Sequence, residues 1–512
     1  MTSPMVATVP DVRLVPSALT SWTVTAAGIV WGGTAAMVVA AVAVLVAGLI
    51  AWRLRMGWPA VVAVAAVGVA FAVAVGLRVD DAEHHPIVSR YGTTAAVVVT
   101  PSESPRVLRG MRMMFRAKLV SLDGRQTTGR VVVFASGVDY GDVTAGRPAA
   151  FRARISRPMR RDLSVAVLTA TGAPRWGTAS LVQRAAADVR ARFAEASRSV
   201  LPGEQAAMLP ALVLGDTSAV SEDVDDEFRA AGLTHLTAVS GANVTIVCGA
   251  VLLTAGLVGP RVAVGLAAVA LIAFVVVVQP SASVLRASVM GSIALFAVLS
   301  KRRRQAIPAL SACVLVLLVA APELAVDVGF ALSVSATAGL VVVAPGWARR
   351  LVDRGWPQPL AAAVSVAAAA QLVTAPLVAG MSGTFSMVSV LANLAVAVVI
   401  PPITVIGTGA AVLTTPWPAA AELMIRFTGP ELWWLTHVAS WASALPGAVV
   451  TTPSGWPGVV TVAVAGLATV ALWRWKWGTR RGRRGGGVPG GVDRRCGVTP
   501  SWREPTAPRP WR

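Results

Sequence analysis

Charge and cysteine are both scarce in this sequence. Charged residues make up 14% of the 512 residues and hydrophobic residues make up 55%. Soluble proteins carry about 25% charged residues, so this composition excludes a soluble protein of this size and indicates a polytopic membrane protein. The three cysteines, Cys248, Cys313 and Cys496, are scattered, and two of them lie in apolar runs. Their spacing provides neither a disulfide framework nor a metal site.

Motifs that signal catalysis or energy coupling are also missing. The sequence contains no Walker A motif, no His-Glu-x-x-His, no Cys-x-x-Cys pair and no Gly-x-Ser-x-Gly, each of which carries a definite chemistry. We therefore expect no enzymatic activity, no catalytic or metal-binding residue and no cofactor. Any energy coupling must come from another chain.

The N-terminal region divides into a polar and an apolar part. Residues 1–25 are rich in Pro, Ser and Thr, lack the basic n-region of a signal peptide, and are expected to form a disordered lead. Residues 26–78 contain two apolar runs that are long enough to cross a bilayer as transmembrane helices. Arg53 and Arg55 lie between the runs, so the positive-inside rule places that loop in the cytoplasm and the chain after the second run outside.

Residues 86–175 consist of short β-branched segments separated by turn signals such as Asp123-Gly124. Five such segments predict a small extracytoplasmic β-barrel or sandwich. The region has fifteen Lys or Arg and five Asp or Glu, an excess that the positive-inside rule does not explain on the outer side. Two interpretations remain open: a solvated barrel facing anionic lipid head groups, and an OB-like module that holds a nucleic-acid backbone.

If this domain binds DNA, phosphate contacts should dominate, because aromatic residues that could stack on bases are scarce. The candidates for stacking are Phe115, Phe134, Tyr140 and Phe151, some of which must belong to the core. The candidate ligands of the DNA backbone are Arg109, Arg112, Arg116, Lys118, Arg130, Arg152 and Arg154.

Residues 178–232 are expected to form amphipathic helices at the membrane interface. The last of these helices, 221–231, begins with a serine suited to an N-cap and has acidic residues in its first turns. Asp225 and Arg229 are four residues apart, and Gly232 can take the left-handed position that ends the helix.

A stripe of polar and small residues follows this helix. Thr237, Ser240 and Asn243 recur every three residues in an apolar run, with Gly241 beside them. Hydroxyls and amides in a spanning helix must face protein or water, and the glycine allows close approach or a local break. The pattern predicts a stripe that lines a cavity at the entrance of the membrane domain.

Residues 233–476 contain repeated apolar runs and are expected to form a transmembrane channel domain. Arg286 lies a few residues into a run, where it either snorkels to the interface or lines a path for an anion. Pro401-Pro402 could kink a span or turn a re-entrant pair. The basic segment 477–512 is expected to be a disordered cytoplasmic tail.

Candidate site residues fall into two groups. The predicted channel or entrance residues are Asp216, His235, Ser240, Gly241, Asn243 and Arg286. Residues that serve either a channel or helix packing are Ser333, Thr337, Gln371 and Asn393. Close packing of helices through small residues accounts for Ser333 and Thr337 without a channel. Gln371 and Asn393 need hydrogen-bond partners, which a contact within the helix bundle provides as well as a pore does.

Residues 212–247, LVLGDTSAVSEDVDDEFRAAGLTHLTAVSGANVTIV, resemble the signature of the ComEC-type competence channels. The core of that signature reads approximately Leu-Gly-Asp, then Gly-Leu-x-His-Leu-Leu-Ala-Val-Ser-Gly-x-His-Val. The chain departs from it at Asn243, where the family has a second histidine. The resemblance covers about residues 86–475, and the family carries an OB-type domain at the place of the predicted barrel.

This resemblance implies a channel that imports single-stranded DNA across the cytoplasmic membrane during natural transformation. The implied partners are the DNA strand, the lipid bilayer, a competence DNA receptor and a cytoplasmic ATP-dependent translocase; a homo-oligomer is left open. Many family members carry a C-terminal metallo-β-lactamase-like domain, but this chain has no His-x-His-x-Asp-His motif. Degradation of the other strand, if coupled, is expected to need a separate nuclease.

Two other functions remain open from the sequence. A transporter of another anionic polymer or of a lipid-linked envelope substrate needs the same pore and basic outer domain. An intramembrane metal-dependent hydrolase could use His235 with Asp216 or Asp223. The same residues also have structural explanations: the acidic residues can cap a helix on a solvent-exposed surface, and His235 can be a hydrogen-bonded structural residue.

Overall fold

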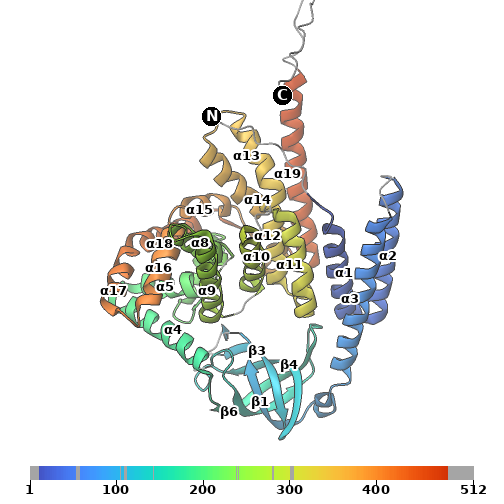
Figure 1. The fold of residues 1–512 in the computed structure, drawn as a ribbon, viewed down its shortest axis with the longest axis vertical. Helices are drawn as coiled ribbons and strands as arrows, with labels where there is room; N and C mark the ends of the chain where they lie inside the picture. The colour runs from blue at the N-terminus through green and yellow to red at the C-terminus, as the bar shows by residue number, and fades with distance from the viewer. Residues whose placement is uncertain are drawn as a thin grey trace, which may run out of the picture.

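The computed structural model describes residues 11–53, 58–103, 105–108, 112–141, 143–237, 239, 241–279, 282–299 and 305–482. A bundle of helices forms most of the molecule, and a β-barrel covers one end of it (Figure 1). The chain is a polytopic α-helical membrane protein with an inserted small barrel, as the sequence predicts.

Three helices precede the barrel: α1 (Val15–Trp31), α2 (Gly33–Arg53) and α3 (Pro59–Glu83). The expectation of disorder over residues 1–25 is wrong from Val15 onward; residues 1–10 lie outside the described part. The hydroxyls that suggested disorder donate within α1, as Thr25 does to the Ser21 carbonyl at 2.6 Å. Because these hydroxyls are satisfied inside the helix, α1 can bury Ser21 and Val24 completely.

The barrel is preceded by a short 3-10 helix, η1 (Pro86–Arg90), and is built from β1 (Thr94–Pro101), β2 (Arg106–Leu108), β3 (Arg112–Leu122), β4 (Arg125–Ser136), β5 (Ala149–Ser156) and β6 (Ser164–Trp176). The strand order is β1-β5-β6-β4-β3-β2, and a further β1–β3 pairing closes five strands into a barrel. All pairings are antiparallel except β4–β6. The small closed β-barrel predicted from the sequence is confirmed.

The side chains of the barrel alternate between the core and the outer surface. Phe115, Tyr140 and Phe151 are buried in the core, so these three candidates for base stacking are structural. Phe134 remains half-buried on β4, with the Arg112 guanidinium 5.8 Å from its ring centre.

Three helices connect the barrel to the membrane region: α4 (Leu181–Val200), α5 (Gly203–Leu214) and α6 (Glu222–Ala230). A capping box between Ser180 and Gln183 starts α4, which runs between the barrel and the bundle (Figure 1). In contrast to the interfacial position predicted for 178–232, the second half of α5 is fully buried. Its apolar residues pack against the later helices, because residues 206–214 are apolar on all sides.

The remaining elements, in chain order, are α7 (Thr234–Thr237), α8 (Gly241–Ala255), α9 (Pro260–Val278), α10 (Ala282–Leu299), α11 (Ala306–Ala320), η2 (Pro322–Val326), α12 (Val328–Ala338), η3 (Gly339–Val343), α13 (Ala344–Val352), α14 (Gln358–Ser382), β7 (Thr384–Ser386), α15 (Ser389–Val396), α16 (Ile400–Leu413), α17 (Pro418–Phe427), α18 (Gly429–Ala444), β8 (Val449–Thr451) and α19 (Trp456–Gly482). In the described part, five helical segments are long and apolar enough to cross a membrane. The pair α15–α16, bent by 53°, could form a sixth span. Four further apolar helices are shorter.

The two ends of the bundle differ. The barrel lies at one end, whereas α13 and the C-terminal end of α19 lie at the other (Figure 1). The last turn of α13 carries Arg349 and Arg350. The expected disordered tail, 477–512, is helical up to Gly482, and the rest of it lies outside the described residues.

Candidate functional site

The stretch 212–247 folds as its residues predict up to Gly232. Ser221 caps α6 by accepting a hydrogen bond from the Val224 backbone N–H, at 3.3 Å. Arg229 pairs with Asp225 at 2.6 Å and also with Asp226. Gly232 has a φ of 73°, in the left-handed region. The predicted short helix over 221–231 and its glycine end are confirmed.

The helical structure is interrupted at Val239, between α7 and α8. Gly241 therefore follows a local break, one of the two roles expected for it. Ser240 lies outside the described residues. A methyl group on Gly241 would lie 2.8 Å from Nη2 of Arg286 and 3.2 Å from Cβ of Ala287. Only a glycine lets the guanidinium lie so close to this backbone.

Arg286 joins three helices of the bundle. Its Nε donates to Oγ of Ser333 on α12 at 2.6 Å, and its Nη1 lies 3.5 Å from the sulfur of Met290. The residue is buried, and no ion pair links it to a carboxylate within the described ranges. A cation buried among membrane helices without an opposite charge is costly, so the arrangement favours binding of an anion.

Asn243 contacts a different part of the bundle. Its side-chain amide donates to the Leu212 carbonyl at 2.8 Å, which ties α8 to the end of α5. Asn243 also lines a small cavity with Leu236, Ile403 and Thr404, about large enough for one water molecule. The predicted polar stripe therefore does not line one wide cavity: Thr237 is buried and donates to the Thr234 carbonyl.

Gln371 and Asn393 meet at a single contact between helices. Ser389 donates to Oε1 of Gln371 at 3.0 Å, and Asn393 donates to the Ser389 carbonyl at 2.8 Å. The Asn393 amide also lies 3.4 Å from the Gly232 carbonyl, a long hydrogen bond. Of the two roles left open for these amides, the geometry supports helix packing: they hold α14 and α15 against the end of α6.

Thr337 donates to the Ser333 carbonyl within α12, so its hydroxyl is satisfied inside its own helix. Asp216 accepts two hydrogen bonds from Ser218, which close a local turn. His235 is exposed on α7. Among the described residues, no group of three or more His, Cys, Asp or Glu could hold a metal ion. The geometry therefore gives no support to a hydrolytic site at Asp216 and His235.

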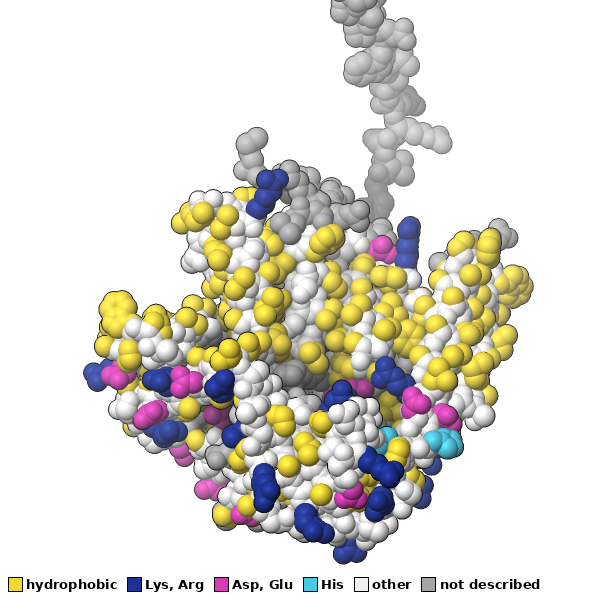
Figure 2. Space-filling view, turned by 60° about the horizontal axis from the view of Figure 1, so that its bottom comes forward, with side chains coloured by type: hydrophobic (Ala, Val, Ile, Leu, Met, Phe, Trp, Pro, Cys, Tyr) yellow, Lys and Arg dark blue, Asp and Glu magenta, His cyan; other side chains and the backbone are white. Residues whose placement is uncertain are grey.

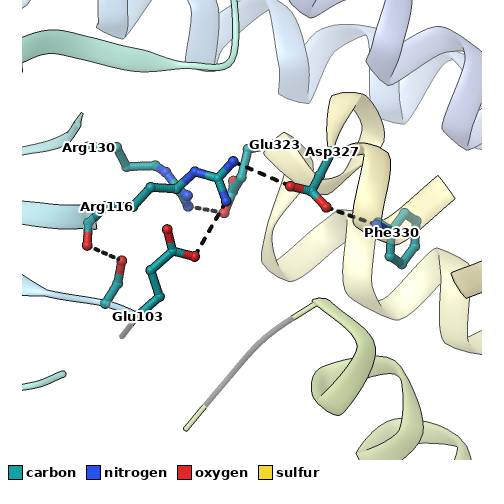
Figure 3. Close-up of polar contacts among 7 residues, drawn as sticks. Glu103, Arg116, Arg130, Glu323, Asp327 and Phe330 are labelled. Carbon is teal, nitrogen blue, oxygen red and sulfur yellow. Dashed lines mark hydrogen bonds and ion pairs between the residues drawn. The ribbon is translucent and has the colours of Figure 1, made fainter. Parts of the chain in front are cut away.

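The seven cations predicted to bind DNA have different environments in the barrel. Arg116 pairs with Glu103 at 3.5 Å and with Asp327 at 3.4 Å, and Arg130 pairs with Glu323 (Figure 3). Their carboxylate partners on η2 and at the start of α12 were not foreseen, although acidic residues are rare in the surrounding apolar runs. Arg109 lies outside the described residues. The exposed candidates are Arg112, Lys118, Arg152 and Arg154.

The family model described as "Competence protein" matches residues 212–477, more than half of the chain. The chain belongs to the competence protein family. No curated protein and no solved structure matches it.

The matched segment of this competence protein begins at Leu212, whose carbonyl binds Asn243. It includes Gly241, Arg286, Ser333 and the contact of Gln371 with Ser389. The barrel precedes the matched segment, so its role rests on its own charge and geometry. The family supports a general role in DNA uptake.

Proposed function

We propose that this competence protein is a channel that passes single-stranded DNA through the cytoplasmic membrane during natural transformation. The observation that carries the proposal is Arg286, a buried cation without a carboxylate partner in the described bundle. Its Nη1 faces the Met290 sulfur, a weak acceptor. A phosphodiester oxygen is a far better partner, because Arg–phosphate hydrogen bonds are charge-assisted.

The barrel fits the outer part of such a path. Arg112, Lys118, Arg152 and Arg154 are exposed on its surface, and basic side chains are visible on the face of the barrel shown in Figure 2. Cations without free aromatic side chains bind a strand through its phosphates and not through its sequence. Such binding suits a channel that must accept any DNA.

We place the barrel outside the cell and the C-terminal end inside. Arg349 and Arg350 of α13 lie at the end of the bundle opposite the barrel (Figure 1), which the positive-inside rule assigns to the cytoplasm. A competence DNA receptor would deliver the strand to the barrel. A cytoplasmic ATP-dependent translocase would pull it, because the chain has no nucleotide-binding motif.

The test is import of labelled DNA in cells that lack this gene and are complemented with variants. Arg286→Ala should abolish import while the protein accumulates normally in the membrane. Arg261→Ala, at the exposed start of α9, is the matched control and should import like wild type. Normal import in the deletion strain would rule out the channel.

A transporter of another anionic polymer is the second candidate, and the burial of Phe115, Tyr140 and Phe151 favours it equally. A barrel that offers cations and few aromatic side chains recognises negative charge and not bases. Nucleic acid that copurifies with the membrane protein would support the first candidate, and a lipid-linked polymer would support the second.

A further inference from the structure

The barrel docks on the membrane domain through the outer face of β3 and β4. Arg116 on β3 contacts Asp327 and Arg130 on β4 contacts Glu323, while Glu103 from the barrel also faces Arg116 (Figure 3). The carboxylates of Glu323 and Asp327 are only 14% and 20% exposed. These ion pairs are therefore partly shielded from water, and removal of one partner leaves the other with an unmatched charge.

The two carboxylates belong to a well-anchored part of the bundle. Asp327 caps α12 by accepting a hydrogen bond from the Phe330 backbone N–H, at 2.8 Å. Trp22 of α1 donates to the Ala325 carbonyl of η2 at 2.8 Å, and its ring lies 5.2 Å from that of Phe330. The acidic partners are thus held by the helices, whereas the arginines belong to the barrel, which has its own hydrophobic core.

The arginines form part of a crowded cationic face. Arg130 lies directly opposite Lys118 across the β3–β4 ladder, and Arg116 lies two residues before Lys118 on β3. Burial and the neighbouring Arg116 lower the pKa of Arg130, which reflects the cost of gathering these charges. In OB folds the face formed by the second and third strands binds oligonucleotides; here those strands are β3 and β4.

We propose that Glu323 and Asp327 form a carboxylate clasp that covers this cationic face, and that phosphates of an incoming single strand displace the carboxylates from Arg116 and Arg130. The proposal rests on the proposed function and adds a regulatory step to it. α12 begins after Asp327 and carries Ser333, the partner of Arg286. Opening of the clasp therefore acts at the start of the helix that supports the buried arginine.

The test compares binding of a fluorescein-labelled oligothymidylate to the purified full-length chain in detergent. The clasp variant is E323Q/D327N, in which the introduced asparagine side chain can still cap α12, because Asn is as good an N-cap as Asp. Loss of these two ion pairs frees Arg130 and leaves Arg116 paired only with Glu103, which should tighten binding about tenfold at low salt, at about 0.7 kcal/mol for each pair. The matched control is D188N/E195Q, which makes the same change in charge on the exposed side of α4.

Tighter binding by the clasp variant alone supports the clasp. Equal tightening in both variants would show an effect of net charge, and unchanged binding would show that the carboxylates only support the fold; either result overturns the clasp. Hydrogen exchange of residues 322–326 gives a second readout. The clasp predicts faster exchange there in the variant, and in wild type after the oligonucleotide is added.

The two proposals can fail separately. If wild type binds the oligonucleotide and the clasp variant binds no tighter, the clasp is wrong and the DNA channel stands. If neither protein binds and exchange of 322–326 is the same in both, the clasp is overturned together with the role of the barrel in DNA binding. Import measured in cells with Arg286→Ala then still tests the channel by itself.

Discussion

Arg286 and Gly241 work as a pair at the level of single residues. The arginine brings a permanent charge into the bundle, and the glycine provides room for it at the break before α8. Ser333 fixes the direction of the guanidinium through one short hydrogen bond. A buried charge held this firmly is costly unless an anion shares the site, which is the physical basis for the proposed path.

Gly241→Ala tests this pair directly. The added methyl group would lie 2.8 Å from Nη2 of Arg286, so the guanidinium must shift and its hydrogen bond to Ser333 must weaken. Loss of a charge-assisted hydrogen bond of about 1.5–3 kcal/mol should reduce DNA import at least about tenfold. Gly249→Ala on the same helix meets nothing within 4 Å and should leave import unchanged.

His85 lies at the junction between α3 and the barrel. Its Nδ1 accepts the Ile87 backbone N–H at 3.2 Å, and its Nε2 lies 3.0 Å from the Thr127 hydroxyl. Burial lowers the pKa of His85 below its ordinary value of 6.5, because the charged ring loses its hydration. The unfolded chain therefore binds the proton more readily than the folded chain.

The sign of the resulting pH dependence follows from this difference. The contribution of His85 to stability is complete above about pH 6.5 and is lost as the pH falls toward the lower pKa of the folded state. The apparent melting temperature should thus decrease between about pH 7 and pH 5. His85→Asn should flatten this part of the curve, and an equally steep curve in that variant would assign the effect to other groups.

At the level of helices and strands, several polar contacts of the membrane region lie where helices end or bend. α6 ends at Gly232, whose carbonyl faces Asn393, and Ser389 links α15 to α14. The α15–α16 pair bends by 53° before Pro401-Pro402, which fits both alternatives left open by the sequence, a kinked span and a re-entrant pair. These polar contacts satisfy amides that lipid could not.

Gly232→Ala tests the contact between α6 and α15. Its φ of 73° costs an alanine about 1–2 kcal/mol, and the methyl group would also lie 2.5 Å from Cβ of Ser389. Gly355→Ala has a similar positive φ of 89° but open space around it. The first variant should therefore lower the apparent melting temperature much more than the second. Equal losses would show that the Ser389 contact contributes nothing.

In the molecule as a whole, the barrel and the bundle present two kinds of positive charge. The barrel exposes cations to water, whereas Arg286 is buried in the bundle. The ion pairs of Arg116 and Arg130 fix how the two parts meet. In the channel that we propose, an anionic strand would first meet the exposed cations of the barrel in water and then the buried arginine of the bundle.

The salt dependence of oligonucleotide binding measures how many phosphates the cations of the barrel contact. Each phosphate neutralised on a single strand contributes about 0.7 to the slope of log affinity against log salt concentration. R152Q/R154Q removes two exposed cations and should reduce the slope by about 1.4. R184Q/R198Q, two exposed arginines on α4, should leave it unchanged. If the slope decreased equally in both variants, it would depend on the net charge of the chain and not on these two positions.

Patterns along the chain were enough to establish the class of the protein, the barrel, the acidic helix and the family. Hydropathy indicates a membrane protein, and alternation of apolar and polar side chains indicates strands. Capping residues and a glycine predict the ends of α6. Each of these signals depends only on residues that are neighbours in the chain. The disorder expected for residues 15–25 was wrong because a count of hydroxyls does not show that they bond within their own helix.

The contacts of the polar residues became apparent only in the folded molecule. Asn243 binds the Leu212 carbonyl, whereas Gly241 lies against Arg286, although the two residues are close neighbours in the chain. Folding also brings Arg116 and Arg130 to carboxylates about two hundred residues away. Charge and hydrogen bonding act through space, and the distance between such groups is set by the packing of whole helices and strands, which no local pattern records.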